Sequence, residues 1–234
     1  MKTKTLLKAL AAPVVASCLS LAMSQAQAAV LTMEVWVEPD ATVDSLADAD
    51  TVIGSGAADY TDTFSFVDHD DAQGNQGFFT NNIAFPNGGD IANIQGQSLV
   101  ARVTGNVYID TAGTYTFGTR NNDGLRLTVG GSELISDSGI HGPQNFFDTD
   151  TYAVGLYAFE IVYYEFNNSA VLEFFATEGA STNLNDFALV GDTANGGLAL
   201  EAPPVVTPVP APASLGLIAA GLFGLFASRR SVRK

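Results

Sequence analysis

The chain has 234 residues, a formal net charge of −15 at pH 7 and a single cysteine, Cys18. Between residues 29 and 201 only three arginines accompany 25 acidic side chains, so this region carries a net charge of −22. Such a surface repels phosphate backbones and anionic membranes, which excludes nucleic-acid binding. The absence of cysteine from the same region excludes a disulfide framework and thiol chemistry there.

The first 28 residues have the composition of a secretory signal peptide. Three lysines precede a long apolar run, and a triplet of small residues at 26–28 closes it, so we expect cleavage after Ala28. The alternative is a lipoprotein-type cleavage box at residues 15–18, with Cys18 as the lipidated first residue. We favour the first interpretation, because the apolar run continues well beyond Cys18.

Residues 29–201 are expected to form one all-β domain. From residue 31 to residue 38 apolar side chains alternate with polar ones, which is the period of a half-buried strand. Residues 41–53 mix apolar and acidic side chains and could be either a short helix or a loop. The following run Asp68-His69-Asp70-Asp71 resembles the first half of a calcium loop, but Phe79 stands where such loops have glutamate, and a solvated acidic loop is the favoured interpretation.

Strand signals become dense after residue 99. Two alternating runs flank residues 121–124, whose Asp-Gly pair is a strong hairpin signal, and a second hairpin is expected around residues 167–169. Short antiparallel strands without a long helical period predict a β-sandwich or flattened barrel. We expect residues 121–124 to form an exposed loop. The side chains expected to point into the core are those of Tyr115, Phe117, Leu125 and Leu127.

Six short runs in this region carry a resemblance to a known family. They are GNVYI at 105–109, AGTYTF at 112–117, NNDGLRL at 121–127, GIHG at 139–142, GLY at 155–157 and YYE at 163–165. Together they resemble the protective-antigen-type domain, also called the PA14 domain. The resemblance implies a β-sandwich that commonly serves as a carbohydrate-binding module. In lectin members an Asp-Asp pair binds calcium, and the calcium coordinates sugar hydroxyls.

The resemblance places the metal site at Asn122 and Asp123, and the carbohydrate site at these two residues together with His141. The first aspartate of the family's pair is Asn122 in this chain, and losing one formal charge should lower the affinity for calcium. The alternative for residues 122–124 is a simple turn, since Asn, Asp and Gly are common turn residues. The alternative for His141 is a hydrogen-bonding role in its glycine-rich loop.

The C-terminus has three successive parts. Residues 202–212 are proline-rich, residues 213–228 form an uncharged apolar run, and residues 229–234 are basic. This order resembles the PEP-CTERM sorting signal of Gram-negative bacteria. The positions that carry the motif are Val209, Pro210, Ala211, Pro212, Arg229 and Arg230, with Ala211 in place of the usual glutamate.

The sorting signal implies export across the inner membrane, a transient membrane-anchored stage through the apolar helix, and removal of the tail by an exosortase-type protease. A plain C-terminal membrane anchor is the alternative. The motifs of hydrolases, phosphate loops and dinucleotide sites are absent, so we do not expect an enzyme. The sequence therefore predicts a non-catalytic cell-surface or biofilm-matrix protein that binds extracellular polysaccharide, with calcium as a possible cofactor. The alternative is a purely structural or adhesive matrix protein.

Overall fold

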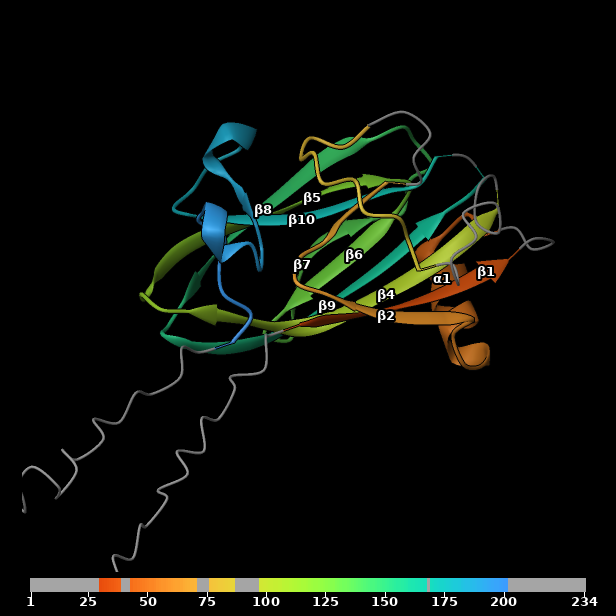
Figure 1. Ribbon diagram of the computed structural model, residues 1–234, viewed down its shortest axis with the longest axis horizontal. Coiled ribbons are helices and arrows are strands. Elements are labelled where there is room, and N and C mark those ends of the chain that lie inside the picture. Colours follow the sequence, from red (N-terminus) through yellow and green to blue (C-terminus); the bar gives the residue numbers. More distant parts are fainter. Residues whose placement is uncertain (1–29, 39–42, 71–75, 87–96, 168, 202–234) are drawn as a thin grey trace, which may run out of the picture.

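The computed structural model describes residues 30–38, 43–70, 76–86, 97–167 and 169–201, and they form the antiparallel β-sandwich that the sequence predicts (Figure 1). The expected signal peptide, proline-rich linker, sorting helix and basic tail lie outside these residues. Within the described part of the chain, no helix is long and apolar enough to cross a membrane.

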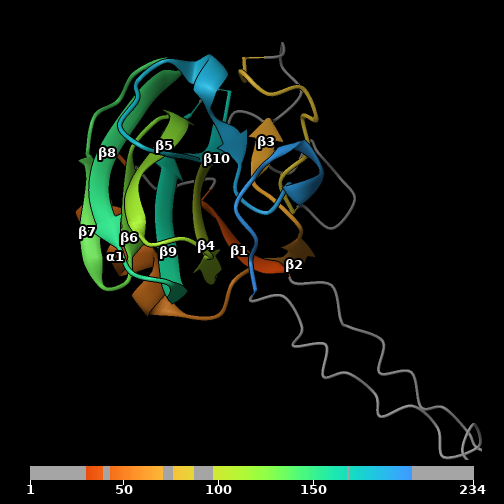
Figure 2. The same ribbon diagram turned by 90° about the vertical axis from the view of Figure 1, so that its left-hand side faces the viewer.

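Two antiparallel sheets face each other across the core (Figure 2). The first sheet has six strands in the order β2-β1-β4-β9-β6-β7. They are β1 (Leu31–Glu38), β2 (Tyr60–Phe64), β4 (Ser98–Ile109), β6 (Leu125–Val129), β7 (Ser132–Asp137) and β9 (Gly155–Glu165). The second sheet has the order β11-β10-β5-β8, and β3 also pairs with β10. Its strands are β3 (Asp68–Asp70), β5 (Gly113–Asn122), β8 (Gln144–Tyr152), β10 (Val171–Glu178) and β11 (Ala188–Leu189).

Both predicted hairpins are wrong. β5 and β6 belong to different sheets, and so do β9 and β10, so residues 123–124 and 166–170 carry the chain from one sheet to the other. An alternating pattern shows which side of a strand is buried but not which strand is its partner. Two strands that face each other across a sandwich carry the same pattern as two strands that pair.

The predicted core residues are confirmed. Tyr115, Phe117, Leu125 and Leu127 are all buried. The centroids of the Phe117 and Phe174 rings are 6.0 Å apart, and Phe174 in turn lies 4.9 Å from Phe159 of the opposite sheet. Aromatic side chains therefore join the two sheets at the centre of the core.

One helix covers the outer face of the first sheet. Residues 41–53 were expected to be a helix or a loop, and the structure has helix α1 (Leu46–Ser55), whose N-cap is Ser45. Leu46 and Ala49 pack with Trp36 on this face, so β1 is buried on both sides at Trp36 rather than half-buried. An ion pair of 2.7 Å between Asp50 and Arg126 also joins α1 to β6.

The acidic run at 68–70 is not the solvated loop that we expected. It forms strand β3, in which Asp68, His69 and Asp70 are all buried beside Glu173 of β10. The reason is that backbone N–H groups of residues 76–81 replace water around the carboxylates. These bonds join Gln76 N to Asp70 Oδ2 (2.9 Å), Phe79 N to Glu173 Oε1 (2.8 Å) and Asn81 N to Asp68 Oδ2 (2.8 Å). Asp71, at the end of the run, lies outside the described residues.

In the described part of the chain, the buried carboxyl group of Glu173 has a hydrogen-bond partner for only one of its two oxygens. Its Oε1 accepts the bond from Phe79, but its Oε2 has no hydrogen-bond partner among the described residues. Burial raises the pKa of the Glu173 carboxyl to about 8, and the N–H of Phe79 and the charge of Arg120 oppose that rise without overcoming it. At neutral pH the folded chain therefore holds a proton on Glu173.

We predict that Glu173→Gln removes a specific pH dependence of stability. The folded pKa is raised above the ordinary value of 4.5, so this group's contribution to stability is fully present below pH 4.5 and is lost as the pH rises towards 8. The slope approaches about 1.4 kcal/mol per pH unit in that window. Urea denaturation at several pH values should show the difference between wild type and variant growing with pH in the variant's favour.

The matched control is Glu133→Gln, because Glu133 is exposed. This variant should keep the pH dependence of the wild type. Parallel stability curves for the wild type and Glu173→Gln between pH 4.5 and 8 would contradict the assignment.

Candidate functional site

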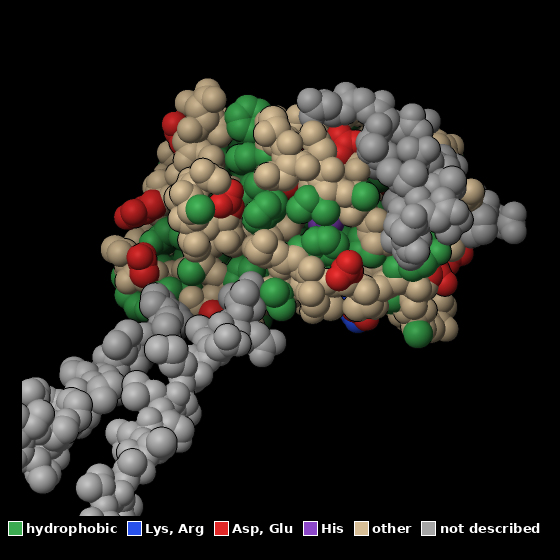
Figure 3. Space-filling view, in the orientation of Figure 1, with side chains coloured by type: hydrophobic (Ala, Val, Ile, Leu, Met, Phe, Trp, Pro, Cys, Tyr) green, Lys and Arg blue, Asp and Glu red, His purple; other side chains and the backbone are tan. Residues whose placement is uncertain are grey.

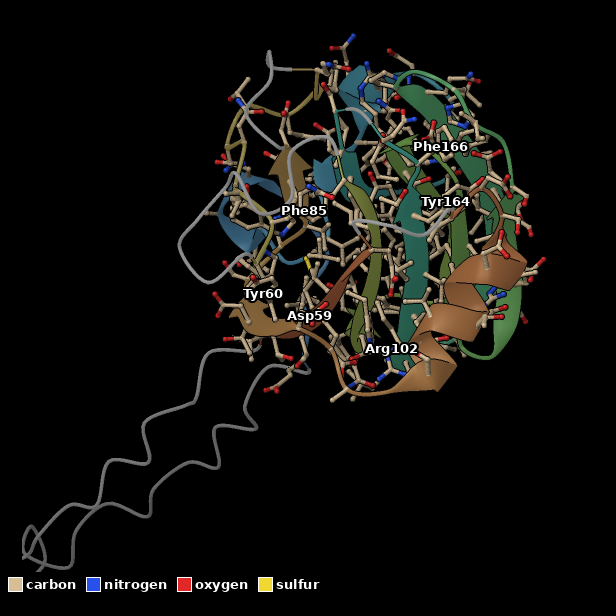
Figure 4. All side chains as sticks on the ribbon, turned by 90° about the vertical axis from the view of Figure 1, so that its right-hand side faces the viewer. Asp59, Tyr60, Phe85, Arg102, Tyr164 and Phe166 are labelled. Atoms are coloured by element: carbon tan, nitrogen blue, oxygen red, sulfur yellow. The ribbon has the colours of Figure 1, made fainter. Side chains whose placement is uncertain are left out.

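Three connections between the sheets or strands meet at one end of the sandwich. They are residues 123–124 between β5 and β6, residues 138–143 between β7 and β8, and residues 166–170 between β9 and β10. Figure 4 looks onto this end, where Tyr164 and Phe166 are labelled above α1. The structure brings together here the three residues that the PA14 resemblance indicates, Asn122, Asp123 and His141.

The carboxylate of Asp123 joins all three connections. Its Oδ1 accepts a hydrogen bond from the backbone N–H of His141 at 2.6 Å, and its Oδ2 accepts one from the backbone N–H of Phe166 at 2.9 Å. The side chain is 3% exposed, so the expectation of an exposed loop at 121–124 is wrong. The peptide bond between Asn122 and Asp123 is cis.

Tyr164 supports this arrangement from β9. The backbone of Asp123 donates to Tyr164 O at 3.2 Å, and the N–H of Tyr164 donates to Gly124 O at 3.0 Å. A Cβ at Gly124 would lie 2.3 Å from the Tyr164 ring, so this close approach requires glycine. The Tyr164 hydroxyl lies 3.0 Å from the carbonyl oxygen of Ser138, and burial together with the charge of Asp123 raises its pKa to about 12.

Two asparagines complete the buried hydrogen bonds. Asn122 Nδ2 donates to the carbonyl oxygen of Ser169 at 2.6 Å, and the hydroxyl of Tyr163 donates to Asn122 O. Asn121 Nδ2 lies 2.6 Å from Asp123 O and 3.2 Å from Asp137 Oδ2. Sequence reasoning missed Asn121, because Asn-Asn-Asp-Gly has the composition of an ordinary turn. It missed Asp137 because this residue lies at the end of another strand, β7.

His141 is fixed by both of its ring nitrogens. Nε2 lies 2.6 Å from Asp137 Oδ2, and Nδ1 lies 2.7 Å from the carbonyl oxygen of Gly142. A carboxylate and a carbonyl only accept, so this geometry favours the protonated form of the ring. Burial alone lowers the pKa of His141, but the bonds to Asp137 and Gly142 and the charges of Asp137 and Asp123 together raise it above the ordinary 6.5.

The atoms around Asn122 and Asp123 include the kinds of ligand that calcium binds. They are a carboxylate, a side-chain amide and backbone carbonyls, all of which offer oxygen. Each oxygen of Asp123 accepts one N–H and keeps further acceptor capacity. Within the described part of the chain, no three His, Cys, Asp or Glu side chains are arranged to hold a metal ion, so calcium would depend on neutral oxygens for most of its ligands.

The comparison with family models decides the classification. The model of the PA14 domain matches residues 53–182, which is more than half of the 234 residues. The chain belongs to the PA14 domain family. The model of the PEP-CTERM protein-sorting motif matches residues 208–231, which confirms the motif expected from the proline block, apolar run and basic end.

Solved structures share the fold at low sequence identity. The chain is 23% identical to a structure described as "PA14 sugar-binding domain from RTX adhesin", with a TM-score of 0.53, and the match covers 70% of this chain and 95% of the other. It is 18% identical to the PA14 domain of the MpAFP antifreeze protein, with a TM-score of 0.56, covering 77% and 98%. No curated protein has a matching sequence. The likeness shows a common architecture.

We predict that the chain's two histidines titrate on opposite sides of the ordinary value. His69 is fully buried between Phe64 and Phe85, and burial lowers its pKa to about 4. His141 should remain protonated above pH 6.5 because of Asp137. Imidazole nitrogen shifts measured by NMR from about pH 2.5 to about pH 9 should give two well-separated midpoints.

The variant Asp137→Asn supplies the control, since it removes the charge that faces His141 and leaves His69 untouched. Its His141 midpoint should fall while the midpoint of His69 stays in place. Two wild-type midpoints that both lie near 6.5 would contradict the burial of His69 and the ion pair of His141.

Proposed function

We propose that the protein is a non-catalytic, exported surface or matrix protein whose PA14 domain binds carbohydrate where Asp123 joins the three connections. The observation that carries the proposal is that one buried carboxylate fixes two backbone N–H groups from separate connections, His141 and Phe166. Loops held this way form a preorganised binding surface on a rigid scaffold. The sugar-binding description of one structural relative supports the same assignment.

Calcium is part of the proposal. Asn122 and Asp123 would hold the ion through oxygen atoms, and the bound ion would coordinate sugar hydroxyls. A single carboxylate with a neutral amide places the site among weak calcium sites, of the kind that extracellular modules use at millimolar calcium. His141 then borders the sugar site without being a metal ligand, because Asp137 and Gly142 occupy both of its ring nitrogens.

The placement of the chain ends supports a role at a surface. At the end of β4 opposite the Asp123 site, Tyr108 N donates to Ala199 O at 2.7 Å, so the described chain finishes there. β1 pairs with β4 at Thr104 and also begins towards that end. The sorting motif at 208–231 therefore follows from the end of the domain that is farthest from the proposed sugar site. An exosortase could process the tail while the site faces outward.

The arginines indicate the class of glycan. Arg102 is paired with Glu34 at 2.5 Å and Arg126 with Asp50 at 2.7 Å. Arg120 donates to Gln76 O at 2.8 Å and to Asn145 Oδ1 at 3.1 Å. These three side chains are the only Lys or Arg between residues 29 and 201, so an acidic polysaccharide would meet a strongly negative domain whose cations are already engaged. Neutral glycans are the ligands to test first.

A structural or adhesive role without sugar binding is the second candidate. The observation that favours it is that both oxygens of Asp123 already accept hydrogen bonds, so the site is complete as a structural cross-link between loops. Asn122, which donates to Ser169 O, also uses its amide within the protein. In that case the same residues stabilise the end of the sandwich and bind nothing.

A glycan array with calcium and with chelator separates the two candidates. We predict that calcium adds binding to neutral glycans at the Asp123 site, and that this added binding is absent in chelator. Asn122→Asp should lower the calcium concentration needed for binding by about tenfold or more, since it adds the second formal charge. Without calcium this variant should melt at a lower temperature, because it loses the hydrogen bond to Ser169 O.

Asp148→Asn is the matched control, because Asp148 is exposed on β8 and the change also alters one charge. Its binding and calcium requirement should equal those of the wild type. An array with the same bound glycans and the same signals in calcium and in chelator would contradict the calcium part. An array without any bound glycan would leave the structural role as the function.

A further inference from the structure

A second concave region lies at the opposite end of the sandwich. It is a cleft of about 650 Å³ between the ends of β4, β5 and β10 and the C-terminal segment 184–199. Tyr108 and Asp110 line it from the end of β4, Glu178 from the end of β10, and Asn185 and Asn195 from the segment. Figure 3 shows acidic side chains at this left-hand end of the molecule. The volume lies within the range of small-molecule sites.

The C-terminal wall of the cleft is a fixed part of the fold. It lies beyond residue 182, where the match to the PA14 domain ends. Val190 N donates to Phe174 O at 3.1 Å, and the centroid of the Phe187 ring lies 5.2 Å from that of Phe175. Gly191 has φ +101°, and a Cβ there would meet Ser65 O at 1.9 Å. The cleft is therefore preformed by a segment that is packed against the second sheet.

The lining of the cleft suits a ligand rich in hydroxyl groups. It offers the carboxylates of Asp110, Glu178 and Asp186, of which Asp186 already accepts from the Ser181 hydroxyl. The amides of Asn185 and Asn195 each donate one hydrogen bond within the protein and have a second N–H and a carbonyl oxygen for a ligand. Lys, Arg and His are absent from the residues described as lining it, so an anionic ligand would find no counter-charge. Asp110 and Glu178 are both exposed. Burial raises the pKa of Tyr115, and the charges of Glu178 and Asp110 raise it further, so both carboxylates lie near the Tyr115 side chain.

We propose that this cleft is a second binding site, and that it takes a neutral oligosaccharide. A cationic ligand would be attracted to the whole acidic surface without needing a preformed cleft lined by amides and hydroxyls. The site shares no residue with the Asp123 site and does not rest on calcium. The two lie roughly 23 Å apart along β5, counting seven residues from Tyr115 to Asn122 at about 3.3 Å each. One molecule can then cross-link two polysaccharide chains.

The test uses a background in which the first site is disabled. We expect Asp123→Ala in chelator to retain binding to at least one neutral oligosaccharide on a glycan array. Adding Asp110→Ala and Glu178→Ala should weaken that binding at least tenfold, and Thr193→Trp, which fills the cleft from its rim, should do the same while keeping both carboxylates. Adding Glu133→Ala and Asp148→Ala instead removes two exposed carboxylates elsewhere and should leave binding unchanged.

Three outcomes would overturn the proposal. One is that Asp123→Ala binds no neutral oligosaccharide. Another is that its binding survives both the double alanine change and Thr193→Trp. The last is that the protein retains only a cationic oligosaccharide, chitosan, in a manner that high salt abolishes. Thermal unfolding of each variant verifies folding, and Asp110 and Glu178 are exposed enough that the alanine variants should melt like the wild type. The first proposed site fails separately, if the wild type and Asp123→Ala bind the same glycans equally well, with calcium and with chelator.

Discussion

The candidate site depends on the buried carboxylate of Asp123. It accepts backbone hydrogen bonds from His141 and Phe166, so connections that leave three different strands are held at one point. A buried carboxylate without such partners would be costly, and the N–H groups would be costly without the carboxylate. The interaction therefore fixes the positions of the loops whether or not a ligand is present. A sugar or calcium ion would meet a surface already in its bound arrangement.

The same use of acidic groups recurs on the second sheet. Asp68, Asp70 and Glu173 are buried and accept backbone N–H groups from residues 76–81, which holds that segment across the sheet's outer face. The acidic residues of this chain thus serve two purposes. Some replace water around buried backbone groups, and the remainder give the domain a surface that repels anionic polymers.

The sequence predicted the sandwich, its core side chains and the family, and it singled out Asn122, Asp123 and His141 before their proximity was visible. It could not show that β5 and β6 lie in opposite sheets, because facing strands and paired strands carry the same alternation. Nor could it show that Asp68 and Asp70 are buried. An acidic run is expected to be solvated, and the backbone N–H groups that replace water here come from residues farther along the chain. The cleft beside Glu178 depends on where residues 184–199 fold back, which no local pattern encodes.

Amide hydrogen exchange at His141 and Phe166 tests the role of Asp123 most directly. In the wild type both N–H groups should exchange slowly, because a buried carboxylate holds them. In Asp123→Ala both should exchange at least about tenfold faster, which corresponds to about 1.4 kcal/mol of lost protection. Amides in the middle of β4 and β9 should keep their wild-type rates. Unchanged rates at His141 and Phe166 in the variant would contradict the claim that this carboxylate holds the site together.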